Sequence, residues 1–190
     1  MSGVTVAFST SSPQASVALI SGACDLLWVG AEFAPQCASG ALPRLLEAGL
    51  KATNLTMSDV SDFAVDLGPG SFTGVRVGIV FAKVLAFAQA VQVRGATAFD
   101  LIDSQHTAFV PSRRGEVFVR IPGAIPYKVS TPPDGAVGYQ YGVSGQFPDA
   151  GRFPPLLSLI PFMEPIELLP AYFAEPSISA PKQPYAERRG

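Results

Sequence analysis

The chain has 190 residues, of which 48% are hydrophobic and 15% are charged, and its formal net charge is −2. This high hydrophobic content excludes a wholly disordered chain. The slightly negative net charge excludes an autonomous nucleic-acid binder with a basic surface. Cys24 and Cys37 are the only cysteines. They are too few for a disulfide framework, so we expect a reducing, cytoplasmic compartment.

The first half of the chain opens on three short apolar runs, at residues 4–8, 15–20 and 26–33. Turn-prone residues separate these runs, which therefore predict an antiparallel meander of strands. The period then changes to that of an α-helix. Four leucines fall at i, i+3, i+4 and i+8 on one helical face: Leu42, Leu45, Leu46 and Leu50.

A strand over residues 62–67, a helix over about 73–90 and a strand over 91–94 are expected next. Thr97 then predicts a brief helix, which its side chain would cap. Three antiparallel strands followed by alternating helices and strands describe a ribonuclease-H-like α/β domain better than a doubly wound one.

Prolines divide the chain unequally, because four of the 18 lie before residue 105 and 14 lie after residue 110. The second half therefore favours short strands, edge segments and irregular loops. We place the boundary near Ser104, which gives an N-terminal subdomain over residues 1–104 and a smaller C-terminal subdomain over residues 105–190.

A glycine-rich turn, from Gly68 to Gly74, joins a predicted strand to a predicted helix, where phosphate-binding loops occur. The turn lacks the Lys that follows the last Gly of a Walker loop, and Thr73 stands where a dinucleotide fingerprint has its third Gly. One interpretation is a nucleotide contact through backbone amides. The other, favoured by the missing charged partners, is a tight turn that lets the helix approach the sheet. The candidate nucleotide-loop residues are Gly68, Gly70, Ser71 and Thr73.

The helix after this turn carries small side chains every four residues, which form a ridge suited to close packing. Around the rest of the helix, Arg76 and Lys83 supply almost the only charge. A helix of this kind is expected to be buried on nearly all sides, against another chain or beneath the second half of this one. The two cations disfavour a membrane span. The ridge comprises Gly74, Gly78, Ala82, Ala86 and Ala90.

Side chains that could carry catalysis are scarce. His106 is the only histidine, so no histidine-pair metal site can form, and the two cysteines have no ligand spacing relative to it. No nucleophile motif is present, and residues 113–116 are interpreted as a charged hairpin tip. We therefore expect no catalytic residue and no metal site.

The segment Gly68-Pro69-Gly70-Ser71-Phe72-Thr73-Gly74-Val75-Arg76-Val77-Gly78 strongly resembles the signature of the TsaB family. That family is the dimerisation subunit of the bacterial machinery that makes threonylcarbamoyladenosine in tRNA. Three further segments are similar to the family's first helix, second-domain hairpin and closing stretch: 42–46, 113–118 and 169–173.

The resemblance implies two ribonuclease-H-like subdomains of the actin-like (ASKHA) superfamily, the second one reduced and proline-rich here. It implies a non-catalytic scaffold that forms a heterodimer with a TsaD-like catalytic subunit, joined by a TsaE-like ATPase. ATP and metal are expected on those partners and no cofactor on this chain, with tRNA met only through the complex. The implied interface uses both helices: Leu42, Leu45, Leu46, Gly74, Val75, Gly78, Ile79, Ala82 and Ala86.

Two positions depart from the family pattern. The first strand usually ends in Asp-Thr-Ser, but this chain has Ser9-Thr10-Ser11, and Cys37-Ala38 replaces the usual His-Ser. The loss of the strand-one acid weakens any nucleotide site. Two alternatives stay open: an actin-like nucleotide-binding protein or weak ATPase that uses the glycine-rich turn, and a homodimer through the same helices when the partner is absent.

Overall fold

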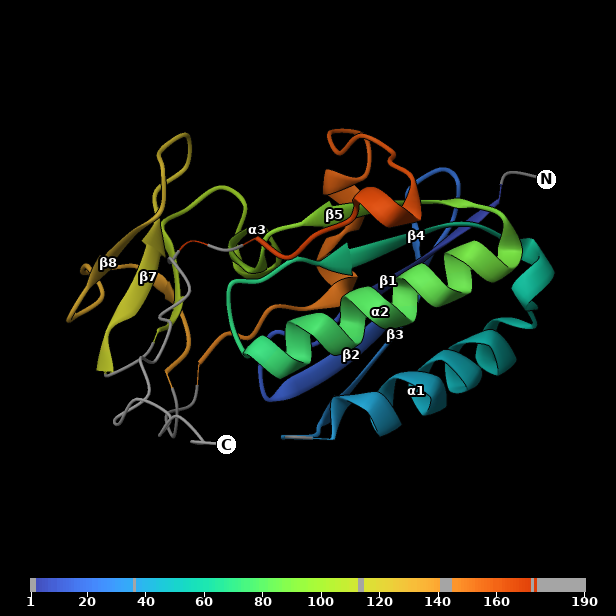
Figure 1. Ribbon diagram of the computed structural model, residues 1–190, viewed down its shortest axis with the longest axis horizontal. Helices are drawn as coiled ribbons and strands as arrows, with labels where there is room; N and C mark the ends of the chain where they lie inside the picture. Colours follow the sequence, from blue (N-terminus) through green and yellow to red (C-terminus); the bar gives the residue numbers. More distant parts are fainter. Residues whose placement is uncertain (1–2, 36, 113–114, 141–144, 172, 174–190) are drawn as a thin grey trace, which may run out of the picture.

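The computed structural model describes residues 3–35, 37–112, 115–140, 145–171 and 173, and it is a mixed α/β protein with two sheets (Figure 1). The first sheet has the order β3-β2-β1-β4-β5. β2 pairs antiparallel with both β1 and β3, whereas β1, β4 and β5 are parallel to one another. This confirms the predicted meander and strand order. The strands are β1 (Val4–Ser9), β2 (Gln14–Ile20), β3 (Leu26–Phe33), β4 (Val60–Asp66) and β5 (Gln92–Ala96).

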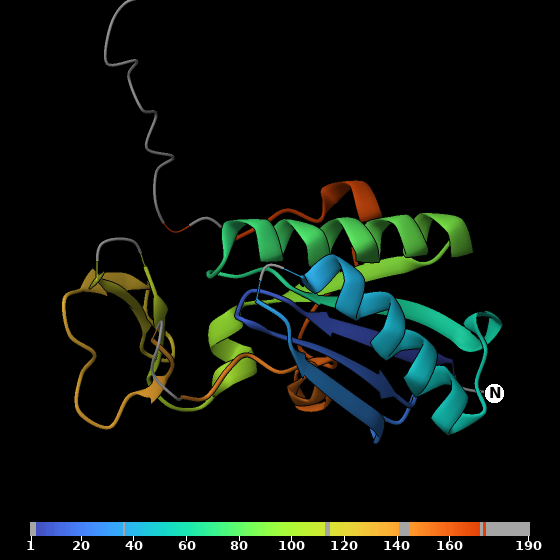
Figure 2. The same cartoon turned by 90° about the horizontal axis from the view of Figure 1, so that it is seen from below.

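Two long helices, α1 (Ala38–Thr53) and α2 (Phe72–Gln89), cover one face of the first sheet (Figures 1 and 2). They contribute to one core with the side chains that β1, β2 and β4 direct to this face. α1 begins four residues before Leu42, so Pro43 lies inside the helix rather than in its first turn. Its missing N–H removes one backbone hydrogen bond there.

The second sheet is smaller and has the order β8-β7-β6-β9. The short helix α3 (Ala98–Ile102), capped by Thr97 as predicted, packs on it through Phe99 and Ile102. β6 and β7 pair antiparallel, which confirms the predicted hairpin, but Arg113 and Arg114 of its tip lie outside the described residues. The strands are β6 (Ala108–Pro111), β7 (Val117–Arg120), β8 (Tyr127–Val129) and β9 (Val137–Gly138).

Residues 149–171, which we call the strap, return from the second sheet to the first. The strap begins with η3 (Ala150–Arg152) and η4 (Pro154–Leu156), which pack on the sheet face opposite α1 and α2. It then rounds β5, where Met163 and Val93 exchange two backbone hydrogen bonds of 2.8 and 3.0 Å. Beyond η5 (Pro165–Glu167), Leu168 is fully buried in the core beneath α2. Figure 1 shows this path in orange and red.

The predicted division at residue 104 falls between the two sheets, and it stays a prediction. The described part of the second half is shared between them, because β6 to β9 form the second sheet while the strap packs on the first.

A buried ion pair fastens the strap to the first sheet. Arg94 of β5 donates from Nε to Asp62 Oδ1 at 2.9 Å and from Nη1 to the carbonyl oxygen of Leu157 at 2.7 Å. Phe162 of the strap lies over the guanidinium group, 4.0 Å from its ring centroid to Arg94 Cζ. Both charges are almost fully buried.

We expect Arg94→Met to lower the free energy of unfolding by about 3–5 kcal/mol, because it leaves the Asp62 carboxylate buried without its partner. Chemical denaturation measures the change. The matched variant Arg94→Met with Asp62→Leu should recover most of the loss, since no buried charge remains. Equal losses in the single and double variants would contradict this account of the pair.

Candidate partner-binding face

The ridge of small residues on α2 packs against the end of β1. A Cβ atom added at Gly74 would lie 2.0 Å from the carbonyl oxygen of Thr10, and one added at Gly78 would lie 2.4 Å from Thr10 Oγ1. The Thr10 hydroxyl donates to the carbonyl oxygen of Gly74 at 2.8 Å. Ala82 and Ala86 continue the ridge and are fully buried, whereas Ala90 lies just past the end of α2 and is exposed, so the ridge ends at Ala86. The ridge therefore allows α2 to lie unusually close to its own sheet.

This packing shows which of the implied interface residues are buried within the chain itself. The small-residue pattern indicates a close approach of two backbones, but it does not say which backbone approaches, and here it belongs to the same chain. The interface that the resemblance implies stays a prediction, and in this structure most of its residues are not exposed to a partner. Of the nine implied interface residues, Leu45 is half-buried and eight are buried: Leu42, Leu46, Gly74, Val75, Gly78, Ile79, Ala82 and Ala86.

The side of α2 that faces away from the sheet is apolar and exposed. Val80, Val84 and Phe87, which we call the outer stripe, are 57%, 60% and 84% exposed. They lie at i, i+4 and i+7, a spacing that puts them on one helical face. By length and apolarity alone α2 could cross a membrane, but its opposite side is built into the core. The spacing was visible in the sequence, and only the position of the sheet distinguishes this face from the ridge.

A groove between α1 and α2 adjoins the outer stripe. Phe81 and Leu85 of α2 line it from one side, and Pro43 and Leu50 of α1 line it from the other. A second hollow continues it towards the start of α2, between Ser39 of α1 and several α2 residues that include two of the outer stripe. The groove and the stripe together form an apolar face that neither sheet covers. A monomer rarely leaves such a face without a partner.

The charges on α2 are all positive. Its 18 residues contain Arg76 and Lys83 and no acidic residue. Arg76 stacks on the Phe72 ring, with its Cζ atom 3.8 Å from the ring centroid, and Lys83 Nζ donates to the carbonyl oxygen of Ile166 at 3.3 Å. Both cations are thereby held beside exposed apolar side chains.

The candidate nucleotide loop turns its backbone towards the protein interior. Ser71 N–H donates to the carbonyl oxygen of Ser11 at 2.6 Å, and Gly68 N–H donates to Asp66 Oδ1 at 2.8 Å. A Cβ atom added at Gly70 would lie 2.1 Å from the same Ser11 oxygen. Thr73 alone of the four candidates points outwards, into the hollow beside α1. These contacts are those of a close-packed turn, and a nucleotide contact at its four candidate residues stays a prediction.

Asp66, at the end of β4, is fully buried beneath this turn. Its Oδ2 atom accepts hydrogen bonds from the hydroxyl groups of Ser9 at 2.7 Å and Ser11 at 2.5 Å. Burial nevertheless raises the pKa of Asp66, because desolvation outweighs these hydroxyl groups and the Gly68 amide, which all lower it. The departure at Ser9 thus supplies a hydrogen-bond donor where a second acid would face Asp66. The sequence did not indicate this cluster, because its members lie far apart along the chain.

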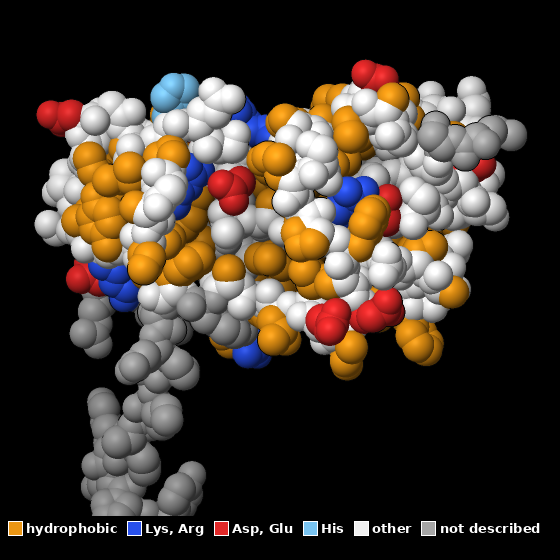
Figure 3. Space-filling view, turned by 90° about the horizontal axis from the view of Figure 1, so that it is seen from above, with side chains coloured by type: hydrophobic (Ala, Val, Ile, Leu, Met, Phe, Trp, Pro, Cys, Tyr) orange, Lys and Arg blue, Asp and Glu red, His pale blue; other side chains and the backbone are white. Residues whose placement is uncertain are grey.

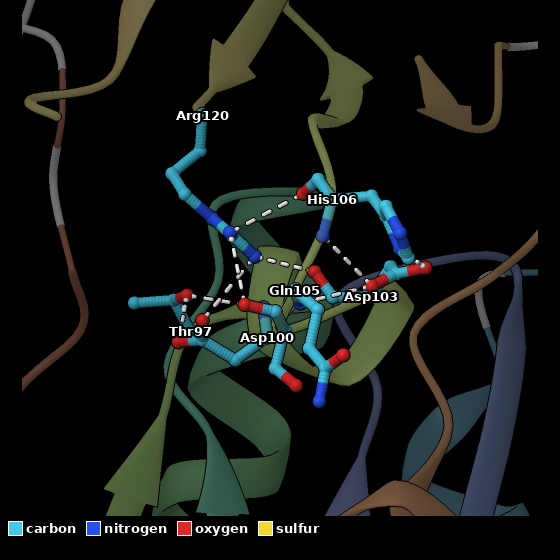
Figure 4. A network of polar contacts seen from close by, with 7 residues as sticks. Thr97, Asp100, Asp103, Gln105, His106 and Arg120 are labelled. Carbon is cyan, nitrogen blue, oxygen red and sulfur yellow. Dashed lines mark hydrogen bonds and ion pairs between the residues drawn. The ribbon is translucent and has the colours of Figure 1, made fainter. Parts of the chain in front are cut away.

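A second polar cluster joins α3 to the second sheet (Figure 4). Arg120 of β7 donates to the carbonyl oxygen of Asp103 at 2.6 Å and lies 3.3 Å from Asp100 Oδ1. His106 is largely exposed, with Nδ1 3.0 Å from Asp103 Oδ2. The described residues contain no group of three metal-ligating side chains. The contacts of Arg120 fasten the turn after α3 to β7.

Comparison with known proteins adds the following matches. The model of the TsaD family, tRNA N6-adenosine threonylcarbamoyltransferase, matches residues 32–100. The protein TsaB of Bacillus subtilis, named for tRNA threonylcarbamoyladenosine biosynthesis, is 29% identical over 76 residues, which are 36% of this chain and 33% of that protein. An uncharacterized Mycobacterium leprae protein is 32% identical over 140 residues, 68% of this chain and 36% of that protein. The chain thus spans about a third of the length of these relatives.

Two solved structures from Pseudomonas aeruginosa share the fold. YeaZ superimposes with a TM-score of 0.73 at 22% identity, over 90% of this chain and 99% of that one. A second protein, described as similar to peptidase YeaZ, superimposes with a TM-score of 0.75 at 21% identity, over 90% of this chain and 100% of that one. The class is therefore a two-sheet α/β protein with the actin-like fold of the YeaZ structures. Within that class, the chain is a TsaB-like protein.

We expect Gly78→Ala to lower the free energy of unfolding by about 1–3 kcal/mol, because the added methyl group has no room beside Thr10. Gly40→Ala is the matched control within a helix, since its Cβ atom would meet only the end of the Arg44 side chain, at 3.3 Å. That control should change stability little or raise it. Thermal unfolding measures both, and a well-tolerated Gly78→Ala would contradict the ridge packing.

The raised pKa of Asp66 predicts a pH dependence of stability. The unfolded carboxyl group titrates near pH 3.9, while the folded protein holds the proton to higher pH. The Asp66 contribution to the free energy of unfolding is therefore fully present below about pH 4 and is lost as the pH rises through the folded-state pKa.

Asp66→Asn removes this titration, so its stability relative to the native chain should improve as the pH rises from about 4 to 7. Urea unfolding at a series of pH values measures the difference. Asp59→Asn is the opposite control, because backbone and side-chain hydrogen bonds to Thr56 lower the pKa of Asp59. A pH-independent difference for Asp66→Asn would contradict the raised pKa.

Proposed function

We propose that this chain is a non-catalytic scaffold subunit that binds and stabilises a TsaD-like catalytic subunit in the complex that makes threonylcarbamoyladenosine on tRNA. The pathway is supported by the names of the Bacillus subtilis relative and of the matching family, which both refer to threonylcarbamoyl modification of tRNA. The partner docks on the outer stripe of α2 and on the groove between α1 and α2. A TsaE-like ATPase joins the assembly, and tRNA meets this chain only through it, in the cytoplasm.

The observation that carries this proposal is the exposed apolar face on a rigid support. α2 is held against the sheet by its buried ridge, so the outer stripe is fixed before a partner arrives. A preorganised apolar face binds without the entropy cost of ordering its own backbone. Helices on a partner that pack against α1 and α2 would bury the stripe and the groove in one interface.

In a scaffold role, this chain leaves the catalytic chemistry to its partner subunits. This chain has a single histidine, and among the described residues the carboxyl group of Asp66 is enclosed rather than presented to a substrate. ATP and metal belong on the TsaD-like and TsaE-like subunits in this proposal. The alternative of a nucleotide-binding protein or weak ATPase draws no support from the glycine-rich turn, whose Gly68 and Ser71 amides bond internal acceptors.

Val84→Asp and Phe87→Asp should each abolish copurification with the TsaD-like protein of the same genome. Each places a charge at the centre of an apolar interface. Both side chains are mostly exposed, so circular dichroism and the thermal midpoint should stay close to those of the native chain. Leu27→Asp, at a half-exposed position on β3 that belongs to neither the groove nor the outer stripe, is the matched control and should still copurify.

Light scattering measures the same association through the mass of the complex. A homodimer of the isolated native chain that Phe87→Asp dissolves would show that the face also serves self-association. If Val84→Asp and Phe87→Asp both bind the partner as well as the native chain does, the proposed interface is wrong.

A further inference from the structure

We infer that Asp66, Ser9 and the carbonyl group of Pro148, which we call the latch, form a proton-dependent contact at the joint between the two sheets. While the Asp66 carboxyl group carries its proton, the Ser9 hydroxyl group holds Pro148. Loss of the proton turns that hydroxyl group to Asp66 and releases Pro148. The latch acts within this chain and does not depend on a partner.

Pro148 lies on the segment that leaves the second sheet and enters the strap. Figure 1 shows the two sheets side by side with α3 between them, and in the space-filling view of Figure 3 the part that carries His106 (pale blue) touches the rest of the molecule. Both neighbours of Pro148 contact that part. The Phe147 ring packs on Tyr139, with 5.0 Å between the ring centroids, and the Asp149 amide donates to a carbonyl oxygen of α3 at 3.2 Å.

The three residues that donate hydrogen bonds to Asp66 each make a second contact across the joint. The partners in these contacts belong to α3, to the residue after β9 or to the segment that enters the strap. The contacts are Ser9 Oγ with the carbonyl oxygen of Pro148 at 3.3 Å, the carbonyl oxygen of Ser11 with Tyr139 Oη at 3.2 Å, and the carbonyl oxygen of Gly68 with the Ala98 amide at 2.7 Å. Asp66 is therefore one bond away from three contacts that hold the two sheets together.

The Ser9 hydroxyl group has one hydrogen atom and two acceptors within reach. Ser9 Oγ lies 2.7 Å from Asp66 Oδ2 and 3.3 Å from the carbonyl oxygen of Pro148, and a hydroxyl group donates one hydrogen bond. An ionised Asp66 is the nearer and stronger acceptor, so Ser9 donates to it and Pro148 loses this donor. A protonated Asp66 donates its own O–H to Ser9 Oγ, and Ser9 then donates to Pro148.

The surroundings of Asp66 leave its charge uncompensated. Asp66 is fully buried, and burial raises its pKa, whereas the described groups that lower this pKa are hydrogen-bond donors and not cations. Tyr139 faces the cluster, but its hydroxyl group donates to Ser11, and Arg152 of η3 is exposed. The other charged side chains on the described elements around Asp66 have partners elsewhere: Arg94 with Asp62, Asp100 with Arg120, Asp149 with Gln14, Arg76 with the Phe72 ring and Lys83 with Ile166.

The hold on Pro148 therefore weakens as the pH rises through the folded-state pKa of Asp66, and the proton goes to bulk water. The test measures amide hydrogen exchange of the full chain by NMR from about pH 4 to pH 8, with rates corrected for the pH dependence of the exchange chemistry. Ser9→Ala should speed exchange of the Asp149 amide about fivefold at the low end, where it removes one hydrogen bond. At the high end it should change the rate little, because Ser9 no longer holds Pro148 there.

Asp66→Asn keeps a neutral donor beside Ser9 at every pH, so the Asp149 amide should stay at its low-pH rate throughout. Ser16→Ala is the matched control. Ser16 Oγ accepts from the Ala150 amide at 2.9 Å, in the same segment, and Ser16 is not among the groups that bond Asp66. Its loss should speed exchange by the same factor at every pH.

An effect of Ser9→Ala that is equally large at low and high pH would overturn the latch. So would an Asp149 rate in Asp66→Asn that still follows the pH as in the native chain, and this variant decides alone if Ser9→Ala does not fold. The Val17 amide, in the middle of the first sheet, reports unfolding of the whole chain. If Ser9→Ala changes exchange at Val17 and Asp149 by equal factors, it acts on global stability and the latch is wrong.

Discussion

The close contact between α2 and the end of β1 determines the rest of this structure. Gly74 and Gly78 let the helix backbone reach Thr10, and that approach directs Val80, Val84 and Phe87 outwards. The same contact draws the glycine-rich turn onto Ser11. One steric requirement, the absence of two Cβ atoms, therefore both lets the turn pack on the end of β1 and leaves an apolar side of α2 exposed.

Elements with strong local periodicity were predictable from the sequence. The meander, both long helices and the small helix after Thr97 follow from patterns that are local in the sequence. The partner of the ridge was not predictable, because a row of small residues indicates close packing without identifying the neighbour. The buried cluster around Asp66 was also missed, since Ser9 and Ser11 lie more than 50 residues before it. Only the parallel pairing of β1 with β4 brings them together.

The strap shows a different limit. Its prolines correctly predicted irregular structure, with three short 3₁₀ turns. The packing role of the strap was not predictable, because its apolar residues follow no helical or strand period. Without a period, the sequence gives no indication of which side chains point inwards. The alternation of buried Leu168 with exposed Leu169 depends on how the strap rounds β5. The family resemblance agreed with the fold, while the interface residues that it implies stay a prediction, and most of them are buried within this chain.

The route of the strap also constrains how the chain assembles during synthesis. The first 96 residues contain every strand of the first sheet, yet the sheet face opposite α1 and α2 stays open until residues 150–157 leave the ribosome. The edge of β5 stays unpaired for longer, until Met163 arrives. An open sheet edge next to an uncovered apolar face invites pairing with other nascent chains. The N-terminal half is thus a state that needs protection, and translation of the last quarter of the chain ends its exposure.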